Sequence, residues 1–267
     1  MKHFPRLFLL ASLLAAIRAT AAGLPDTGQI TCYNDTAADG VPASSAVSIA
    51  RDTGAYPRQD CRFGRDAAAA GSALPKAGAG VAGFDYTKVG NNGALLAASA
   101  TPGTSAADWA CTRDNATGLT WEVKTTSPTD LRYFGHTYSW YNTDAAVNGG
   151  GAGAAGTNTC SATLPGNQCN TQAFVAAVNA AALCTYADWR MPTTRELQTL
   201  VRADGSSPAL DQSWFPNTTA SSLWTASTYA DNADRAWIVN FQIGNTPTSS
   251  KSGNPRLGVR LVRGGQF

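Results

Sequence analysis

The sequence predicts an α+β fold, in which two helices pack on short antiparallel sheets joined by long loops. Two segments with helical periodicity, 171–183 and 193–202, follow each other along the chain. Segments in which apolar and polar residues alternate, as they do in β-strands, lie before and after these helices. Six cysteines in a chain of 267 residues are the third observation, because disulfides can hold long loops in place.

The first 22 residues have the three parts of a secretory signal. Lys2 and Arg6 supply a positive start, residues 7–17 are apolar, and Ala19-Thr20-Ala21 is a small-residue cleavage site. We therefore expect an exported protein in the periplasm, at the cell surface or outside the cell, with no membrane span in the mature chain. Arg18, close to the cleavage site, leaves an uncleaved anchor as the alternative.

Charge and cysteine content restrict the partners and the compartment. Cleavage removes Lys2, Arg6 and Arg18, which lowers the 20 basic residues to 17 against 18 acidic ones, a net charge of −1. Nucleic acid is therefore not an expected partner. An even number of cysteines in an exported chain favours disulfides over metal thiolates. Their spacing does not determine the connectivity; the preferred pairs are Cys32–Cys61, Cys111–Cys184 and Cys160–Cys169.

The N-terminal part of the mature chain differs in composition from the rest. Residues 23–108 are rich in Ala, Gly, Pro and Asp and have few apolar runs, so we expect an irregular segment of loops with a few short strands, packed on the main domain. The main domain is predicted to span residues 109–267. It begins with a half-buried strand over 119–124, and a Gly/Ala-rich tract at 145–166 is predicted to be a long surface loop.

Both predicted helices have capping residues. The first presents Phe174, Val178 and Ala181 on one face, and Asn170 or Thr171 can cap it.

The second helix follows the segment Asp188-Trp189-Arg190-Met191-Pro192-Thr193, which we call the motif segment. Thr193 is the predicted N-cap, and Glu196 three residues later can complete a capping box. The expected tasks of the preceding residues are also structural. Trp189 packs in the core, Asp188 orients Arg190, and Pro192 ends the preceding strand or turn.

Three later segments alternate as strands do: 223–227, 237–243 and 257–261. In the second of them we expect the core face to hold Trp237, Val239, Phe241 and Ile243.

Several of these segments together resemble the Lcl C-terminal domain family, in the right order and over about residues 109–264. The matching blocks are 114–121, 177–180, 188–193, 196–197, 223–227, 236–241 and 259–263. This family is named after a bacterial collagen-like adhesin, in which the domain contributes to binding sulfated glycosaminoglycans. The resemblance implies a C-type-lectin-like fold, also similar to formylglycine-generating enzymes. The residues that it marks as structural are Trp121, Asp188, Trp189, Arg190, Pro192, Thr193, Glu196 and Trp237.

The chain differs both from the collagen-like adhesin and from the formylglycine-generating enzymes. It has no Gly-X-Y repeat, so a collagen-type trimer is not implied. A formylglycine-generating oxidase needs a cysteine pair near its C-terminus, whereas here no cysteine follows Cys184. His136 is the one histidine of the mature chain, so a histidine-based triad has no other candidate, and a packing role is expected for it.

Carboxylates leave two alternatives open. An acid/base pair could be drawn from Asp108, Asp114, Glu122, Asp188, Glu196 and Asp204. Calcium is the metal that the oxygen-rich turns Asp114-Asn115 and Asp231-Asn232-Ala233-Asp234 could hold. Neither turn has the EF-hand pattern, and the sugar-binding motif of calcium-dependent lectins is missing. No cofactor is otherwise predicted.

The positive indication of ligand binding is a basic cluster near the C-terminus: Lys251, Arg256, Arg260 and Arg263. Because Arg256 and Arg260 lie opposite the apolar face of the last strand, both are expected to point away from the core. Such a stripe could bind sulfate or carboxylate groups, with Trp224 and Tyr229 stacking on sugar rings. The alternative for the basic cluster is a solvated strand face that does not bind a ligand. The alternative for Trp224 is a packing role in the core.

The sequence therefore predicts an exported, non-catalytic binding module, with adhesin-like recognition of an acidic or sulfated polysaccharide at the cell surface. An enzyme of unknown reaction on the same scaffold is one alternative. A structural subunit that docks on a surface protein is the other.

Overall fold

The protein is described from a computed structural model over residues 26–29, 31–33, 38–42, 60–252 and 256–265. The predicted signal at 1–22 lies outside the described residues. Within them, no helix is long and apolar enough to cross a membrane.

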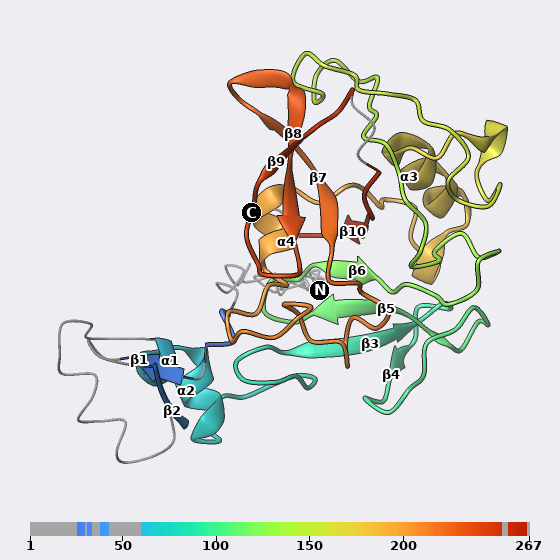
Figure 1. The fold of residues 1–267 in the computed structure, drawn as a ribbon. Coiled ribbons are helices and arrows are strands. Elements are labelled where there is room, and N and C mark those ends of the chain that lie inside the picture. The colour runs from blue at the N-terminus through green and yellow to red at the C-terminus, as the bar shows by residue number, and fades with distance from the viewer. Residues whose placement is uncertain (1–25, 30, 34–37, 43–59, 253–255, 266–267) are drawn as a thin grey trace, which may run out of the picture.

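A five-stranded antiparallel sheet crosses the lower middle of Figure 1 in the order β10-β6-β5-β3-β4. Its strands are β3 (Tyr86–Gly90), β4 (Leu95–Leu96), β5 (Trp109–Asp114), β6 (Thr120–Glu122) and β10 (Val262–Arg263). β3 pairs with β5 from Tyr86, opposite Asp114, to Gly90, opposite Trp109. The sheet therefore includes strands from the segment that the sequence predicts to be irregular.

A three-stranded antiparallel sheet lies above the first one in Figure 1, in the order β7-β8-β9. Its strands are β7 (Ser222–Tyr229), β8 (Asn232–Asn240) and β9 (Thr248–Ser250). Val239 and Phe241 are fully buried, as predicted. Trp237 is half-buried and Ile243 is 70% exposed, so their predicted core positions are wrong. β8 ends at Asn240, whose carbonyl accepts from Gly244 N in a turn, and Ile243 lies on that turn.

The first predicted helix is α3 (Thr171–Ala180), which lies beside the three-stranded sheet. Asn170 caps it by accepting from Ala173 N at 2.8 Å, and Phe174 and Val178 are buried as predicted. The helix ends three residues earlier than its predicted end at 183. The chain enters the left-handed region at Ala182 and Cys184 and forms a 3₁₀ turn, Leu183–Thr185, which directs Cys184 to its disulfide partner.

The second predicted helix is α4 (Thr194–Gln198), shorter than the predicted 193–202. The capping box between Thr193 and Glu196 is confirmed in both directions. Leu197 and Leu200 are buried, so the apolar face persists beyond the helix.

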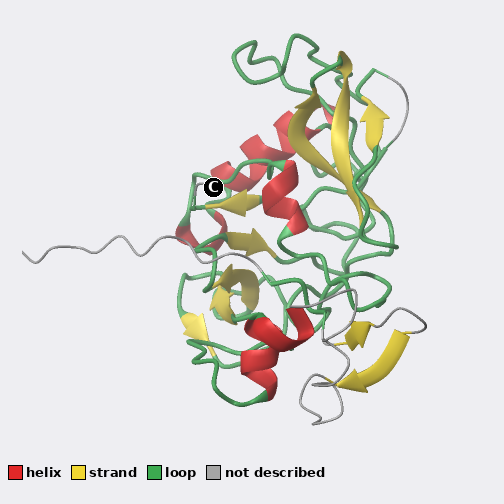
Figure 2. Ribbon diagram, turned by 90° about the vertical axis from the view of Figure 1, so that its left-hand side faces the viewer, coloured by secondary structure: helices red, strands yellow, loops and turns green. Residues whose placement is uncertain are grey.

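Loops connect most elements of the protein (Figure 2). A group of smaller elements lies at the other end of the molecule, at the lower left of Figure 1. This group consists of the strand pair β1 (Thr31–Tyr33) and β2 (Ala38–Pro42) and the helices α1 (Asp60–Phe63) and α2 (Arg65–Ala70). A further 3₁₀ turn is Pro165–Asn167.

The alternating pattern predicts that β6 is half-buried, but all three of its residues are buried. Trp121 is fully buried, but Glu122 on the opposite face is fully buried too and pairs with Lys124 at 2.7 Å. The burial of Lys124 lowers its pKa to about 8. Both faces of β6 are covered: Trp121 belongs to an apolar cluster that includes Leu197 and Phe215, and the Glu122 carboxylate accepts from Lys124 Nζ and Leu261 N.

Two predicted disulfides are confirmed, Cys111–Cys184 and Cys160–Cys169. Cys61 is also disulfide-bonded, but the side chain of Cys32 is outside the described ones, so that pairing stays a prediction. The fold is thus α+β with mostly antiparallel sheets, as expected. Its C-type-lectin-like form stays a prediction.

Candidate functional site

A pocket in the described part of the chain lies beside the motif segment, and we call it the motif pocket. Its volume is about 540 Å³, within the range of small-molecule sites. Segments 140–147, α3, the motif segment, the start of α4 and β7 contribute its lining. These residues are Trp140, Tyr141, Asn142, Val147, Thr171, Gln172, Val175, Arg190, Met191, Thr193, Glu196 and Ala226.

Backbone pairing holds the motif segment at the pocket. Arg190 N donates to Val262 O at 2.9 Å and Val262 N to Arg190 O at 3.0 Å, so the segment adds to the edge of β10. Ala226 N of β7 donates to Pro192 O at 2.7 Å. The motif segment therefore joins the two sheets, and its position follows from both.

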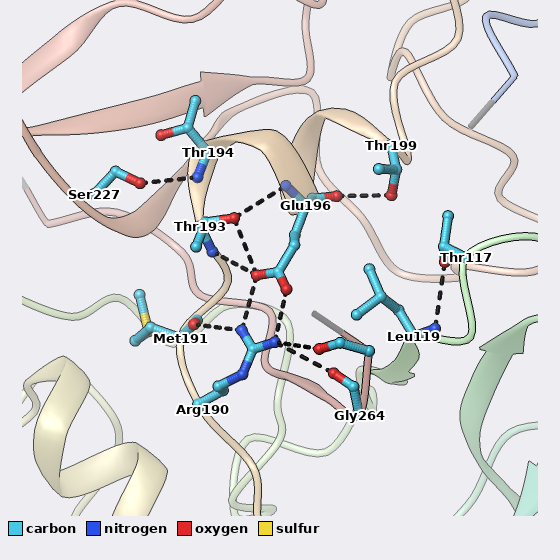
Figure 3. A network of polar contacts seen from close by, with 11 residues as sticks. Thr117, Leu119, Arg190, Met191, Thr193, Thr194, Glu196, Thr199, Ser227 and Gly264 are labelled. Atoms are coloured by element: carbon cyan, nitrogen blue, oxygen red, sulfur yellow. Dashed lines mark hydrogen bonds and ion pairs between the residues drawn. The ribbon is translucent and has the colours of Figure 1, made fainter. Parts of the chain in front are cut away.

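Arg190 and Glu196 form a two-pronged ion pair at the pocket wall (Figure 3). Arg190 Nη1 lies 2.8 Å from Glu196 Oε2, and Nη2 lies 2.6 Å from Oε1. Nη2 also contacts the carbonyl oxygens of Gly264 and Gly265 at 3.3 Å each. Thr193 donates to Glu196 Oε2 from its backbone N at 2.8 Å and from its hydroxyl at 3.1 Å.

These contacts set the protonation of the pair. Burial raises the pKa of Glu196, but the hydrogen bonds from Arg190 and Thr193 outweigh burial and hold this pKa below its usual value. The hydrogen bond with Glu196 raises the pKa of Arg190. Both groups are therefore charged at neutral pH and neutralise each other. Because four donors occupy the Glu196 carboxylate, it is poorly placed to act as a general base.

The aromatic side of the pocket is rigidly held. Trp140 is 2% exposed and its Nε1 donates to Thr225 O at 2.9 Å. Lys251 Nζ lies 3.9 Å from the centroid of the Trp140 ring, a cation–π contact. Tyr141 is fixed to α3, because Thr171 Oγ1 accepts from Tyr141 N at 3.0 Å and donates to Tyr141 O at 2.8 Å.

The predicted basic stripe does not form a solvent-exposed face. Arg260 is 1% exposed, which contradicts the expectation that it points away from the core. Its guanidinium donates to Glu122 O and, at 2.7 Å, to Thr218 Oγ1, and burial lowers its pKa to about 10. The alternation argument was wrong here because Phe215 and Thr218 lie against the Arg260 guanidinium on the face that was predicted to meet solvent.

Lys251 is also 1% exposed, so its expected place in the stripe is wrong as well. Its Nζ donates to Asn148 O at 2.7 Å, Gly151 O at 3.2 Å and Thr228 Oγ1 at 2.7 Å. Burial lowers its pKa. Lys251 therefore holds the 148–151 loop on the three-stranded sheet.

The remaining predicted ligand residues make separate local contacts. Arg256 donates to the hydroxyls of Thr157 and Thr159. Tyr229 donates to Asp231 Oδ2 at 2.8 Å. Trp224 is fully buried and its Nε1 donates to Tyr138 O at 2.8 Å, so it presents no sugar-stacking face.

Arg263 binds Asp188 through Nε at 2.7 Å and Nη2 at 3.0 Å. Asp188 thus orients Arg263, and the prediction that it orients Arg190 is wrong; Glu196 has that task. Trp189 packs in the core at 2% exposure, as predicted.

His136 and Asp114, which were weighed as chemical groups in the sequence, have structural roles. His136 is 3% exposed with Nε2 3.0 Å from Asp130 O, and burial lowers its pKa. The Asp114 carboxylate accepts from the backbone N–H groups of Ala116 and Thr117, as a turn residue does. Neither predicted calcium turn forms a cluster of three acidic, His or Cys residues; within the described residues such a cluster exists elsewhere, at Asp26, Asp60 and Asp66.

The motif pocket lies inside a segment that matches a known family. The model of the Lcl C-terminal domain matches residues 110–263, more than half of the chain. The chain belongs to the Lcl C-terminal domain family. This membership indicates a domain associated with surface proteins and adhesins. Comparison with curated proteins and with solved structures found no match.

The pocket of this Lcl C-terminal domain was not predicted as a site. The sequence did single out the motif segment, but as a structural element. Gln172 and Val147 had no signal, because exposed residues on a helix face or in a Gly/Ala-rich loop resemble an ordinary surface. Val175 is half-buried and resembles a packing residue of α3.

Proposed function

We propose that this Lcl C-terminal domain is a surface-associated binding module that takes a segment of an uncharged polysaccharide in the motif pocket, without catalysing a reaction on it. The observation that carries this proposal is the composition of the pocket: a large, mostly apolar hollow whose ionic groups neutralise each other.

The chemistry of the lining suits a sugar. Sugar rings present C–H faces and hydroxyl edges. Tyr141, Val175 and Met191 offer apolar surface for the C–H faces. Gln172 and Asn142 also line the pocket, and amide groups can donate to or accept from hydroxyls. Their amide oxygens accept from the backbone N–H groups of Thr143 and Asp144, which holds both side chains in position. A few polar groups in an apolar hollow are typical of small-ligand sites.

Charge favours an uncharged ligand over a sulfated one. Arg190 is the cation of the lining, and Glu196 neutralises it at 2.6 Å. Lys251 and Arg260, two of the four predicted sulfate-binding residues, are buried. An anionic ligand in the motif pocket would have to compete with Glu196 for Arg190.

The lining also favours binding over catalysis. Glu196 is the carboxylate of the pocket, and a pair of carboxylates is required for acid/base cleavage of a glycosidic bond. Thr171 is hydrogen-bonded to the backbone of Tyr141 and has no base beside it among the lining residues.

A glycan array tests the proposal with two matched variants. Val147→Asp places a charge at the pocket rim, where the side chain is 59% exposed, while Ile243→Asp places the same charge on an equally exposed aliphatic residue outside the lining. We expect binding to neutral glycans that changes little with salt, and a loss of about tenfold, or about 1.4 kcal/mol, in Val147→Asp alone. Binding restricted to sulfated glycans, lost on adding salt and equal in both variants, would contradict the proposal.

A further inference from the structure

Three carboxylates meet outside the family-matched segment. Asp26 precedes β1, Asp60 begins α1 and Asp66 lies in α2. One oxygen of each lies within 4.8 Å of the others. Calcium binds carboxylate oxygens at about 2.3–2.6 Å, so two oxygens on one ion lie at most about 5 Å apart. The three groups are therefore close enough to share one ion.

Two of these carboxylates are buried and incompletely bonded. Asp66 is 1% exposed and Asp26 is 8% exposed. Asp66 Oδ1 accepts from Gly83 N at 2.7 Å. Asp26 Oδ2 and Asp66 Oδ2 have no hydrogen-bond partner within the described residues. Buried carboxylates without partners cost folding free energy, so a proton or a cation is expected between them.

Among the described side chains, the surroundings hold the cluster in place and no cation is hydrogen-bonded to Asp26 or Asp66. The loop at Gly83 closes over Asp26 so tightly that a Cβ at this position would collide with Asp26 Oδ2. The nearby cations direct their donors elsewhere. Arg65 Nε donates to Gly83 O at 3.0 Å, and Lys76 Nζ donates to Gly80 O at 2.7 Å and Ala82 O at 2.6 Å.

We propose that Asp26, Asp60 and Asp66 bind one divalent cation of the calcium type. Hard carboxylate oxygens without His or Cys ligands favour calcium over zinc and other transition metals. The ion would tie the chain at Asp26 to α1 and α2. This site is separate from the motif pocket, so the proposal does not depend on polysaccharide binding.

The competing explanation is a shared proton. Burial and the neighbouring Asp66 raise the pKa of Asp26 to about 8, which would leave Asp26 neutral in the absence of a cation. The two explanations differ in what happens on replacing Asp66 by asparagine. A cation site is lost in that variant, whereas a proton-sharing pair is replaced by an equivalent neutral hydrogen bond.

The experiment uses the purified full chain, freed of metal with a chelator and titrated with CaCl₂ by calorimetry and by thermal unfolding. We expect one ion per chain, with a dissociation constant on the order of 0.1–1 mM or tighter, and a higher Tm with calcium. Asp66→Asn should weaken binding by at least about tenfold and remove the shift in Tm. Asp234→Asn, which removes an exposed carboxylate from one of the other oxygen-rich turns, should leave both unchanged.

Three results would overturn the proposal. They are the absence of calcium binding, equal binding in wild type and Asp66→Asn, and a Tm in Asp66→Asn that is raised equally with and without calcium. Should Asp66→Asn fail to fold, Asp60→Asn replaces it, because Asp60 is half-buried and the same loss of binding is expected.

Discussion

The ion pair between Arg190 and Glu196 permits a quantitative test of how the motif segment is held. The Glu196 side chain is 3% exposed, whereas that of Arg190 is 39% exposed. Glu196→Gln retains the shape of the side chain and, since Gln also serves at this position of a capping box, most of the helix cap. The variant therefore removes the charge and one acceptor, because the amide NH₂ group cannot accept from Arg190 Nη2.

The magnitude follows from the burial of the two partners. Breaking a fully buried ion pair costs about 3–5 kcal/mol, because the remaining charge is left without a partner. Water reaches the Arg190 guanidinium, so we discount this to about 2 kcal/mol for Glu196→Gln. Glu196→Ala also removes the cap, which adds about 1 kcal/mol. For a domain of this size, 2 kcal/mol corresponds to a fall in Tm of about 4–8 °C.

Urea denaturation of a double-mutant cycle measures the pair directly. The cycle compares wild type, Arg190→Met, Glu196→Gln and the double variant, and we expect a coupling energy of about 1–2 kcal/mol. A coupling below about 0.5 kcal/mol, or a Glu196→Gln variant as stable as wild type, would refute the role assigned to this pair.

Three further predictions concern pH, a buried ammonium and the disulfides. The pKa of Glu196 in the folded protein lies below its ordinary value of 4.5, so the stabilisation by the Glu196 carboxylate is present above about pH 4.5 and is lost as pH falls through the folded value. The difference in unfolding free energy between wild type and Glu196→Gln should therefore shrink as the pH is lowered below 4.5. A difference that stays constant with pH would contradict this. Lys251→Met removes three hydrogen bonds, although Thr228 Oγ1 still donates to Asn148 O, and should cost about 2–3 kcal/mol in urea denaturation, whereas unchanged stability would show that the ammonium is not bonded. Replacing Cys111 and Cys184 by serine opens a loop with a sequence separation of 73 and should cost about 4.5 kcal/mol. The other disulfide, with a separation of 9, should cost about 2.7 kcal/mol, and the reverse order under the same denaturation assay would contradict the loop-length argument.

Local features were predictable where a few neighbouring residues determine them. Asn170 caps α3 and Thr193 with Glu196 caps α4, because capping needs a hydrogen bond that spans two or three residues. The turn at Asp114 followed for the same reason. Helix ends were less accurate: α3 stops at Ala180, since the turn that leads to Cys184 depends on a partner 73 residues away.

Burial was predicted poorly wherever both faces of a strand are covered. The alternation rule assumes one face in water. Glu122 and Arg260 lie on the face predicted to be polar and exposed, yet both are buried, and Arg260 donates to the carbonyl of Glu122. Lys251 shows the same error. A basic residue near the chain end looks solvated in the sequence, but here it meets three oxygens brought from distant loops.

The sequence by itself determined the family, the α+β class and both helix caps, because each of these depends on residue identity and short spacing. The tertiary structure alone decided where the site lies. The motif segment, which the sequence presents as a structural anchor, also lines the motif pocket, since β7, β10 and α3 converge on it. Likewise Asp26 and Asp66, forty positions apart, become a possible cation site through folding, because proximity and burial depend on the path of the whole chain.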